Sequence, residues 1–264
     1  MKDFRVLRYR IDIISIAFVL LALGVQFTAY WLALPWYTLF LILVLIRQVN
    51  LVEHNHAHLG VFHSRFLNET LGFMCFISNG TPYEFYIVHH VQNHHAYNQK
   101  FEEVEKDWSS MYGFSTAHYP DRPIGQFYYF LSFPIITICH SLIHILRRPD
   151  SSIFRRFVRT MALFAIFCTV LIAIDPISFL FFFFLPWLVV YFGLGDNNYA
   201  HHYGCKMTNP YDSSNTFLQL QYQAVGLYIG YHVAHHIKPD LHWSKLPEYH
   251  RSIQDKIPEE NFRQ

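Results

Sequence analysis

The sequence predicts an all-α integral membrane protein whose four transmembrane helices carry a cytoplasmic, histidine-rich helical cap that holds a metal site. Composition is the first reason: 52% of the 264 residues are hydrophobic, only 15% are charged, and there are 26 Phe and 18 Tyr. A soluble domain of this length would carry more charge. Long apolar runs are the second reason, and four separate histidine clusters are the third.

Four apolar runs predict the membrane spans. Residues 11–31 are long enough to cross a hydrocarbon core of about 30 Å, and we interpret them as a retained anchor because a signal peptide is shorter. Residues 35–51 return the chain after a tight turn. Residues 155–174 and 177–193 form a second hairpin, which turns at Asp175 and Pro176.

The run at 124–146 is apolar enough to span but contains Pro134, His140 and His144. A full crossing here would place the second and third histidine clusters on opposite sides of the membrane. We therefore predict an interfacial or re-entrant element within a single membrane domain, 1–264.

Charge predicts the orientation. The turns at 32–35 and 174–176 contain no Lys or Arg, whereas the opposite side has the basic N-terminus, Arg47 and the arginines between 147 and 159. By the positive-inside rule, both termini and all histidine clusters face the cytoplasm.

The histidine clusters share a helical spacing. His232, His235 and His236 lie at i, i+3 and i+4, so they project from one face of a helix. Comparable groups occur at 54–58, 89–95 and 198–202. Imidazole suits iron, zinc, copper and nickel, and rings crowded together without a metal would repel when protonated. The clusters therefore predict a polynuclear metal site.

The set His-x3-His, His-x3-His-His and His-x2-His-His resembles the membrane fatty acid desaturase and hydroxylase superfamily, which includes the alkane monooxygenases. The segment from His232 to His236 is similar to the third histidine box of acyl-lipid desaturases, and the tail from His236 to His250 to the "HH-x-x-P … LP-x-x-H" pattern of bacterial desaturases. The segment from Asn198 to Gly204 resembles the "NYxxHYG" element of alkane monooxygenases. The resemblance covers about residues 50–250.

The resemblance implies two iron ions held by about nine histidines, and Asn198 corresponds to an asparagine that reaches a metal through water. The matching positions are His54, His58, His90, His94, His95, His202, His232, His235 and His236. The second box has three intervening residues, as in the alkane hydroxylase branch, so desaturation and hydroxylation both stay open.

Other polar residues receive weaker assignments. On a helix His56 points away from His54 and His58, so we predict that it lies outside the ligand set or faces solvent. His89 and His201 are candidate substitutes for the ligands next to them. Four carboxylates are candidates to accept ring N–H bonds from ligands: Glu53, Glu84, Asp107 and Asp196. The remaining histidines are predicted to be structural or interfacial: His63, His118, His140, His144, His242 and His250.

The implied activity is O2-dependent desaturation of a fatty-acyl or other lipid chain, with hydroxylation or oxidative decarboxylation as alternatives. Electrons require a separate ferredoxin, rubredoxin or cytochrome partner, because the chain has no Gly-x-Gly-x-x-Gly after a strand and no CxxC spacing. A metal transporter would place ligands in mid-span, and a zinc hydrolase would need only three ligands and a glutamate base. Both are disfavoured, and no basic stripe indicates nucleic acid.

Overall fold

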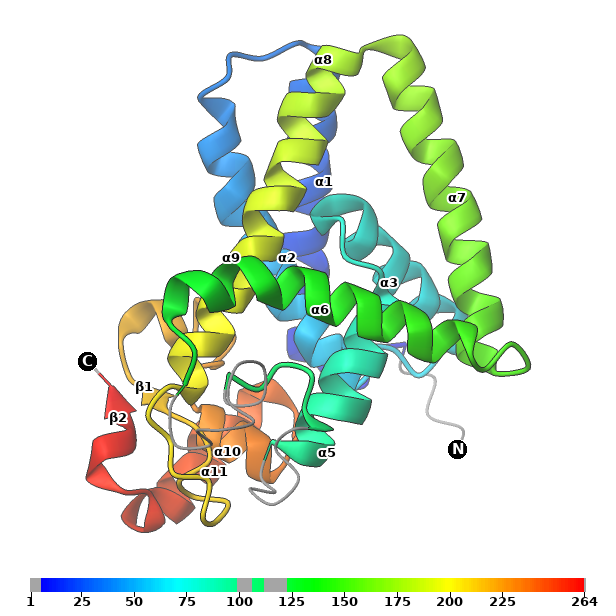
Figure 1. Ribbon diagram of the computed structural model, residues 1–264. Coiled ribbons are helices and arrows are strands. Elements are labelled where there is room, and N and C mark those ends of the chain that lie inside the picture. Colours follow the sequence, from blue (N-terminus) through cyan, green and yellow to red (C-terminus); the bar gives the residue numbers. More distant parts are fainter. Residues whose placement is uncertain (1–5, 99–105, 112–122, 264) are drawn as a thin grey trace, which may run out of the picture. The chain divides into compact units, whose positions relative to one another are not determined.

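The computed structural model describes residues 6–98, 106–111 and 123–263, and these residues are mostly helical (Figure 1). The chain forms two compact units, each from two segments: Met1–Tyr86 with Ile143–Tyr191, and Ile87–Leu142 with Phe192–Gln264. Since neither unit is a continuous stretch, the chain does not divide into two sequential domains. The single domain over 1–264 stays a prediction.

The first unit is built from long apolar helices. Helix α1 packs on α2, α3 and α8. Its elements are η1 (Arg10–Asp12), α1 (Ile13–Trp31), α2 (Thr38–His58), α3 (Arg65–Asn79), α4 (Tyr83–Phe85), α7 (Ser152–Ile174), α8 (Pro176–Phe179), the π-helix η4 (Leu180–Phe184) and the start of α9 (Leu185–His202).

Aromatic rings and a few satisfied polar groups form the core of this unit. Tyr30, Phe183 and Trp187 lie among buried aliphatic side chains. The amide of Gln26 donates to the carbonyls of Ser78 and Phe182, at 3.0 and 3.2 Å. Helix α3 ends at Gly80 with φ 75°, where a Cβ would lie 2.5 Å from Trp187. Glycine is therefore required at this turn.

The second unit has shorter elements and carries most of the histidines. A small parallel pairing of β1 with β2 joins Thr216 to Phe262, an addition to the all-α prediction. The elements are the π-helix η2 (Tyr86–His94), α5 (His95–Tyr97), most of α6 (Gln126–Leu146), the end of α9, β1 (Thr216–Phe217), η5 (Leu220–Tyr222), α10 (His232–Ile237), η6 (Trp243–Lys245), α11 (Leu246–Ile253), η7 (Gln254–Lys256), η8 (Glu259–Asn261) and β2 (Phe262–Arg263).

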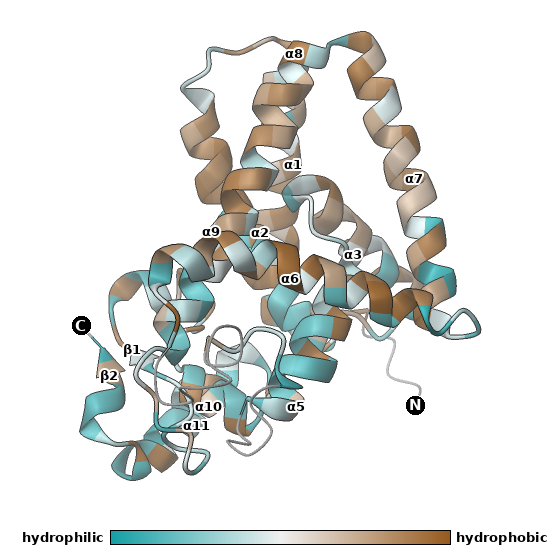
Figure 2. Ribbon diagram, viewed as in Figure 1, coloured by the Kyte–Doolittle hydropathy of each residue, from teal (hydrophilic) through white to brown (hydrophobic). Residues whose placement is uncertain are grey.

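Four helices of the described residues are long and apolar enough to cross a membrane, by length and composition: Arg10–Trp31, Gln126–Leu146, Ser152–Ile174 and Pro176–His202. Figure 2 shows α1, α7 and the first half of α9 as largely hydrophobic. Three of these helices coincide with predicted spans. The fourth is α6, which we predict to be interfacial, and it takes the place of α2.

Helix α2 differs from the other spans in its second half. Its first half exposes Phe40, Leu41 and Val44, whereas its second half buries Gln48 and Glu53 together with histidines. Buried polar groups lower the mean hydropathy of a helix even where its outer face is apolar. Length and composition therefore do not decide between α2 and α6, and the predicted interfacial position of α6 needs a direct test.

Candidate metal centre

His94, at the end of the π-helix η2, has a separate role for each ring nitrogen. Its Nδ1 lies 3.0 Å from Asp107 Oδ2 and 2.8 Å from the Ser109 hydroxyl. Its Nε2 is buried and has no hydrogen-bond partner among the described residues. An Nδ1–H that donates to a carboxylate leaves the lone pair on Nε2, which is the tautomer that binds a metal.

Three further histidines meet His94 within the second unit. The ligand atoms of His94, His202, His232 and His236 all lie within 4.8 Å of one another, and the four residues are buried. The Nε2 atoms of His202 and His232 are 3.3 Å apart, and those of His232 and His236 are 3.1 Å apart. Metal–imidazole bonds of about 2.0–2.1 Å put neighbouring nitrogens of a tetrahedral or octahedral site about 2.9–3.4 Å apart. The four rings therefore fit a metal ion.

The turn after α9 orients His202. Nδ1 of His202 donates to the carbonyl of Ser213 at 3.0 Å, which leaves the Nε2 lone pair facing the cluster. The Asn215 amide donates to the carbonyls of Ala200 and Tyr203, so it caps the end of α9. Backbone partners thus fix both the helix end and the tautomer of its last histidine.

Burial and neighbouring groups shift the pKa of two groups at the site. Desolvation, followed by the neighbouring imidazoles of His95, His232, His202 and His94, holds the pKa of His236 well below its usual range. For Asp107, burial raises the pKa, but His94 and the hydrogen bonds from His94 and Ser109 outweigh it and lower the pKa overall. A neutral His236 and an ionised Asp107 are the protonation states that a bound cation needs.

Three other predicted ligands gather in the same unit. The Nε2 atoms of His90 and His95 are 3.2 Å apart, and the rings of His90 and His235 stack with centroids 6.1 Å apart. His95 also stacks on His236 at 4.3 Å. All seven predicted ligands of the second unit therefore lie in one continuous group of imidazoles.

The first-box histidines lie in the first unit on α2. His54 and His58 are one turn apart, with ring centroids separated by 5.3 Å. His56 is buried on another face, where its Nε2 donates to the Asn68 carbonyl at 2.9 Å and its Nδ1 accepts from the amide of Val61 at 3.2 Å. Both ring nitrogens of His56 are used in packing α2, so it is neither solvent-exposed nor a ligand.

The four candidate carboxylates have different partners. Asp107 is hydrogen-bonded to the predicted ligand His94. Glu53 accepts from Asn79 at 2.5 Å, Glu84 pairs with Arg156 at 2.6 Å, and Asp196 accepts from Gln126 at 2.6 Å. Ser109 was not foreseen as part of this arrangement, although an Asp followed two residues later by Ser is a common local hydrogen-bonding spacing.

The π-helix explains the unusual spacing of the second box. His90, His94 and His95 lie at i, i+4 and i+5, and the first two belong to η2. A π-helix has i→i+5 hydrogen bonds and so takes one more residue in each bonded turn than an α-helix. His-x3-His-His on η2 therefore presents its rings much as His-x2-His-His does on α10.

Several predicted histidines lie outside the four converging ligands. His89 lies edge-on to Phe133 at 5.6 Å, and His201 stacks on His232 at 4.0 Å. His140 lies against Trp108, His144 accepts from Arg148, His242 accepts from Ser244, His250 lies against Tyr231, and His63 is exposed. His118 falls outside the described residues.

Asn198 lies one turn before His202 on α9, yet its amide is directed to a tyrosine. Asn198 Nδ2 donates to the hydroxyl of Tyr129 at 2.6 Å. The predicted contact with iron through water is therefore not the interaction that the amide nitrogen makes.

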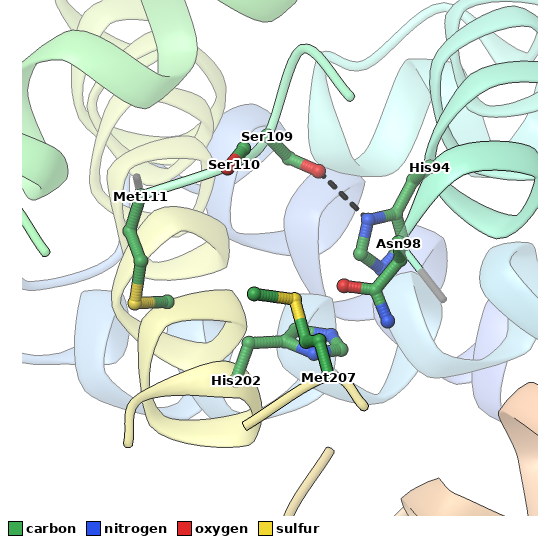
Figure 3. Close-up of a pocket in the computed structure, with 7 residues that line it drawn as sticks. All are labelled: His94, Asn98, Ser109, Ser110, Met111, His202 and Met207. Carbon is green, nitrogen blue, oxygen red and sulfur yellow. Dashed lines mark hydrogen bonds between the residues drawn. The ribbon is translucent and has the colours of Figure 1, made fainter. Parts of the chain in front are cut away.

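A small cavity adjoins His94 and His202. Figure 3 shows its lining, with the Ser109 hydroxyl bonded to His94. The lining residues are His94, Asn98, Ser109, Ser110, Met111, His202 and Met207. The space open to water-sized molecules is about 10 Å³, which is about what one water molecule requires.

Clustered buried imidazoles that could hold a metal, in a chain with long apolar helices, define a class of membrane protein with a candidate all-nitrogen metal site. The family model for fatty acid desaturase matches residues 29–264. The chain belongs to the fatty acid desaturase family and is an integral membrane oxidoreductase that acts on lipid chains. A search of curated proteins finds no match to the chain.

Proposed function

We propose that this chain uses O2 and two iron ions to desaturate a fatty-acyl or other lipid hydrocarbon chain. The observation that carries the proposal is the convergence of four buried histidine ligand atoms within 4.8 Å. The buried Nε2 of His94 supports it, because such an atom without a partner is costly unless a cation accepts its lone pair.

We assign His94, His202, His232 and His236 to one iron. The other predicted ligands of the second unit, His90, His95 and His235, are proposed for the second iron, and the resemblance implies His54 and His58 as further ligands. The resemblance of all three boxes to the family supports this division, and so does the stacking of His90 with His235. Asp107 would hold the tautomer of His94, and the Ser213 carbonyl would hold that of His202.

When bound, an iron pair with nitrogen ligands supplies reductive O2 activation and the oxidising power to remove hydrogen from an unactivated C–H bond. The chain's own part is to hold the imidazoles neutral, to exclude water and to position one carbon of the substrate. The long apolar helices suit the chain to a membrane, where lipid substrates are found.

Desaturation is favoured over hydroxylation by the third box and by the tail from His236 to His250. The spacing of the second box argued for hydroxylation, but the π-helix accounts for the extra residue without a change in chemistry. Oxidative decarboxylation remains a further alternative on the same site.

The proposed orientation follows from the distribution of basic residues, and the proposed electron donor follows from the absence of flavin and iron–sulfur motifs in the sequence. The termini and the histidine clusters are proposed to face the cytoplasm, where the arginines between 147 and 159 favour retention. Electrons are proposed to arrive from a ferredoxin, rubredoxin or cytochrome-type donor that docks on this face.

Metal content tests the proposal. The purified, detergent-solubilised protein is expected to hold about two irons per chain after reconstitution with ferrous iron under anaerobic conditions. His94→Ala and His235→Ala are expected to lose iron and turnover while remaining in the membrane. His63→Ala is the matched control, because His63 is exposed.

The products then separate the reactions. An alkene from acyl substrates supports desaturation, an alcohol supports hydroxylation, and a shortened alkene supports decarboxylation. One zinc per chain that ferrous iron does not displace, or full activity in either alanine variant, would overturn the di-iron assignment.

A further inference from the structure

We propose that Tyr129 is a positioning residue for the metal ligand His94, and that Asn198 acts through it. The inference rests on the proposed iron site. It differs from the water-mediated role expected for Asn198, because the amide nitrogen of that side chain is committed to the Tyr129 hydroxyl.

A chain of short hydrogen bonds leads from Tyr129 to His94. The Tyr129 hydroxyl donates to the carbonyl of Ser109 at 2.5 Å. The Ser109 hydroxyl donates to Asp107 Oδ1 at 2.6 Å, and the Ser109 amide donates to the same oxygen at 2.9 Å. The Nδ1–H of His94 is then shared by Asp107 Oδ2 and the Ser109 hydroxyl.

Proton counting fixes the direction of this chain. A tyrosine hydroxyl has one hydrogen, which it gives to the Ser109 carbonyl, so it accepts from Asn198. The Ser109 hydroxyl likewise gives its hydrogen to Asp107, so it accepts from His94. The two hydroxyls therefore each have one assigned acceptor, and the His94 N–H is shared between Asp107 and Ser109.

The residues of this hydrogen-bond chain are buried, so the loss of any one hydrogen bond is costly. Tyr129 is 2% exposed, Ser109 and Asp107 are 3% exposed, and His94 is 1% exposed. The Tyr129 ring packs among Met111, Phe133 and Tyr199, so its position is set by the core. Without the hydroxyl, the Ser109 carbonyl and the Asn198 amide would each lose a buried partner. The turn that holds Asp107 against His94 would then loosen.

Tyr129→Phe tests the proposal, because it removes the hydroxyl and keeps the ring. Outer-sphere partners of metal ligands are worth about 10–100-fold in metal affinity, so we expect Tyr129→Phe to weaken ferrous binding about tenfold. The Mössbauer signal of one of the two irons should also change. Tyr128→Phe is the matched control, since the neighbouring Tyr128 is 73% exposed.

A double-mutant cycle tests the role of Asn198. If Asn198 acts through Tyr129, the variant Asn198→Ala with Tyr129→Phe should bind iron as weakly as the weaker single variant, and no more weakly. Effects that multiply would show an independent route from Asn198 to the metal and would overturn that part of the proposal.

Two further results separate the possible failures. If Tyr129→Phe does not accumulate in membranes, Asn198→Ala tests the contact to the Tyr129 hydroxyl, and Ser109→Ala removes the hydroxyl that bridges Asp107 and His94; both should weaken ferrous binding. Unchanged affinity and an unchanged spectrum in a folded variant would overturn the inference alone. Failure of the unmodified protein to bind two irons would overturn the proposed function itself.

Discussion

The two nitrogens of His94 show how a single side chain can be prepared for a metal. The carboxylate on Nδ1 fixes the ring, while Nε2 lies within reach of three other imidazoles. His56 has the opposite arrangement, since both of its nitrogens bind the backbone. Hydrogen-bond partners therefore distinguish a ligand from a structural histidine more clearly than sequence spacing does.

Asp107→Asn should disturb the tautomer of His94. Ser109 already donates twice to Oδ1, so the new amide nitrogen would face Nδ1 and favour a proton on Nε2. We expect ferrous affinity to fall about 10–100-fold, the range known for such partners, as measured by anaerobic iron titration. Asp196→Asn is the control, because Asp196 is exposed and binds Gln126. Equal losses in both variants would contradict the role of Asp107.

The π-helix η2 determines how the histidines of the second box are placed. Its i→i+5 bonding brings three histidines with an extra spacer to one face. Single-turn π geometry in other proteins is concentrated at functional sites. Here the π geometry means that a spacing resembling hydroxylases need not indicate a hydroxylase site.

Deletion of Gln92 should convert this turn to α-helix while keeping the histidines on one face. Gln92 is exposed, so its removal costs little packing. We expect the deletion variant to retain at least about half of its iron by elemental analysis. Deletion of Val233 on the α-helix α10 should remove the iron, because α10 has no extra residue to lose. Equal loss from both deletions would refute this account of the spacing.

The position of α6 in the membrane has an experimental answer. Cysteines placed at Phe127 and Leu146 mark its two ends, which are 68% and 53% exposed. With the exposed Cys139 replaced by alanine, an interfacial helix should react with an impermeant maleimide at both ends from the cytoplasmic side only. A cysteine at Leu32 should react from the other side and serves as the control. Labelling of the two α6 ends from opposite sides would establish a full crossing.

The predicted metal ligands are concentrated in one of the two units. The first unit has an aromatic core around Tyr30, Phe183 and Trp187, whereas seven of the predicted ligands lie in the second. A unit that buries many imidazoles gains stability from the metal that it binds.

Iron removal should therefore loosen the second unit more than the first. We expect anaerobic chelation to raise amide hydrogen exchange in residues 87–98, 199–203 and 231–237, measured by mass spectrometry in detergent. Helix α7 in the first unit is the internal reference and should keep its protection. An equal rise in α7, or no rise at the histidine segments, would contradict this coupling.

Local patterns were enough to predict the apolar helices and the histidine clusters that could hold a metal, because apolar length and helical periodicity are properties of adjacent residues. Only the tertiary structure decided among Glu53, Glu84, Asp107 and Asp196, and only it directed Asn198 to Tyr129. His94 and Asp107 are 13 positions apart in the sequence, and Asn198 and Tyr129 are 69 positions apart. Packing sets such distances, and no local spacing records them. The π-helix could not be predicted from the sequence for a related reason, since its backbone hydrogen bonding is set by the packing of the folded chain.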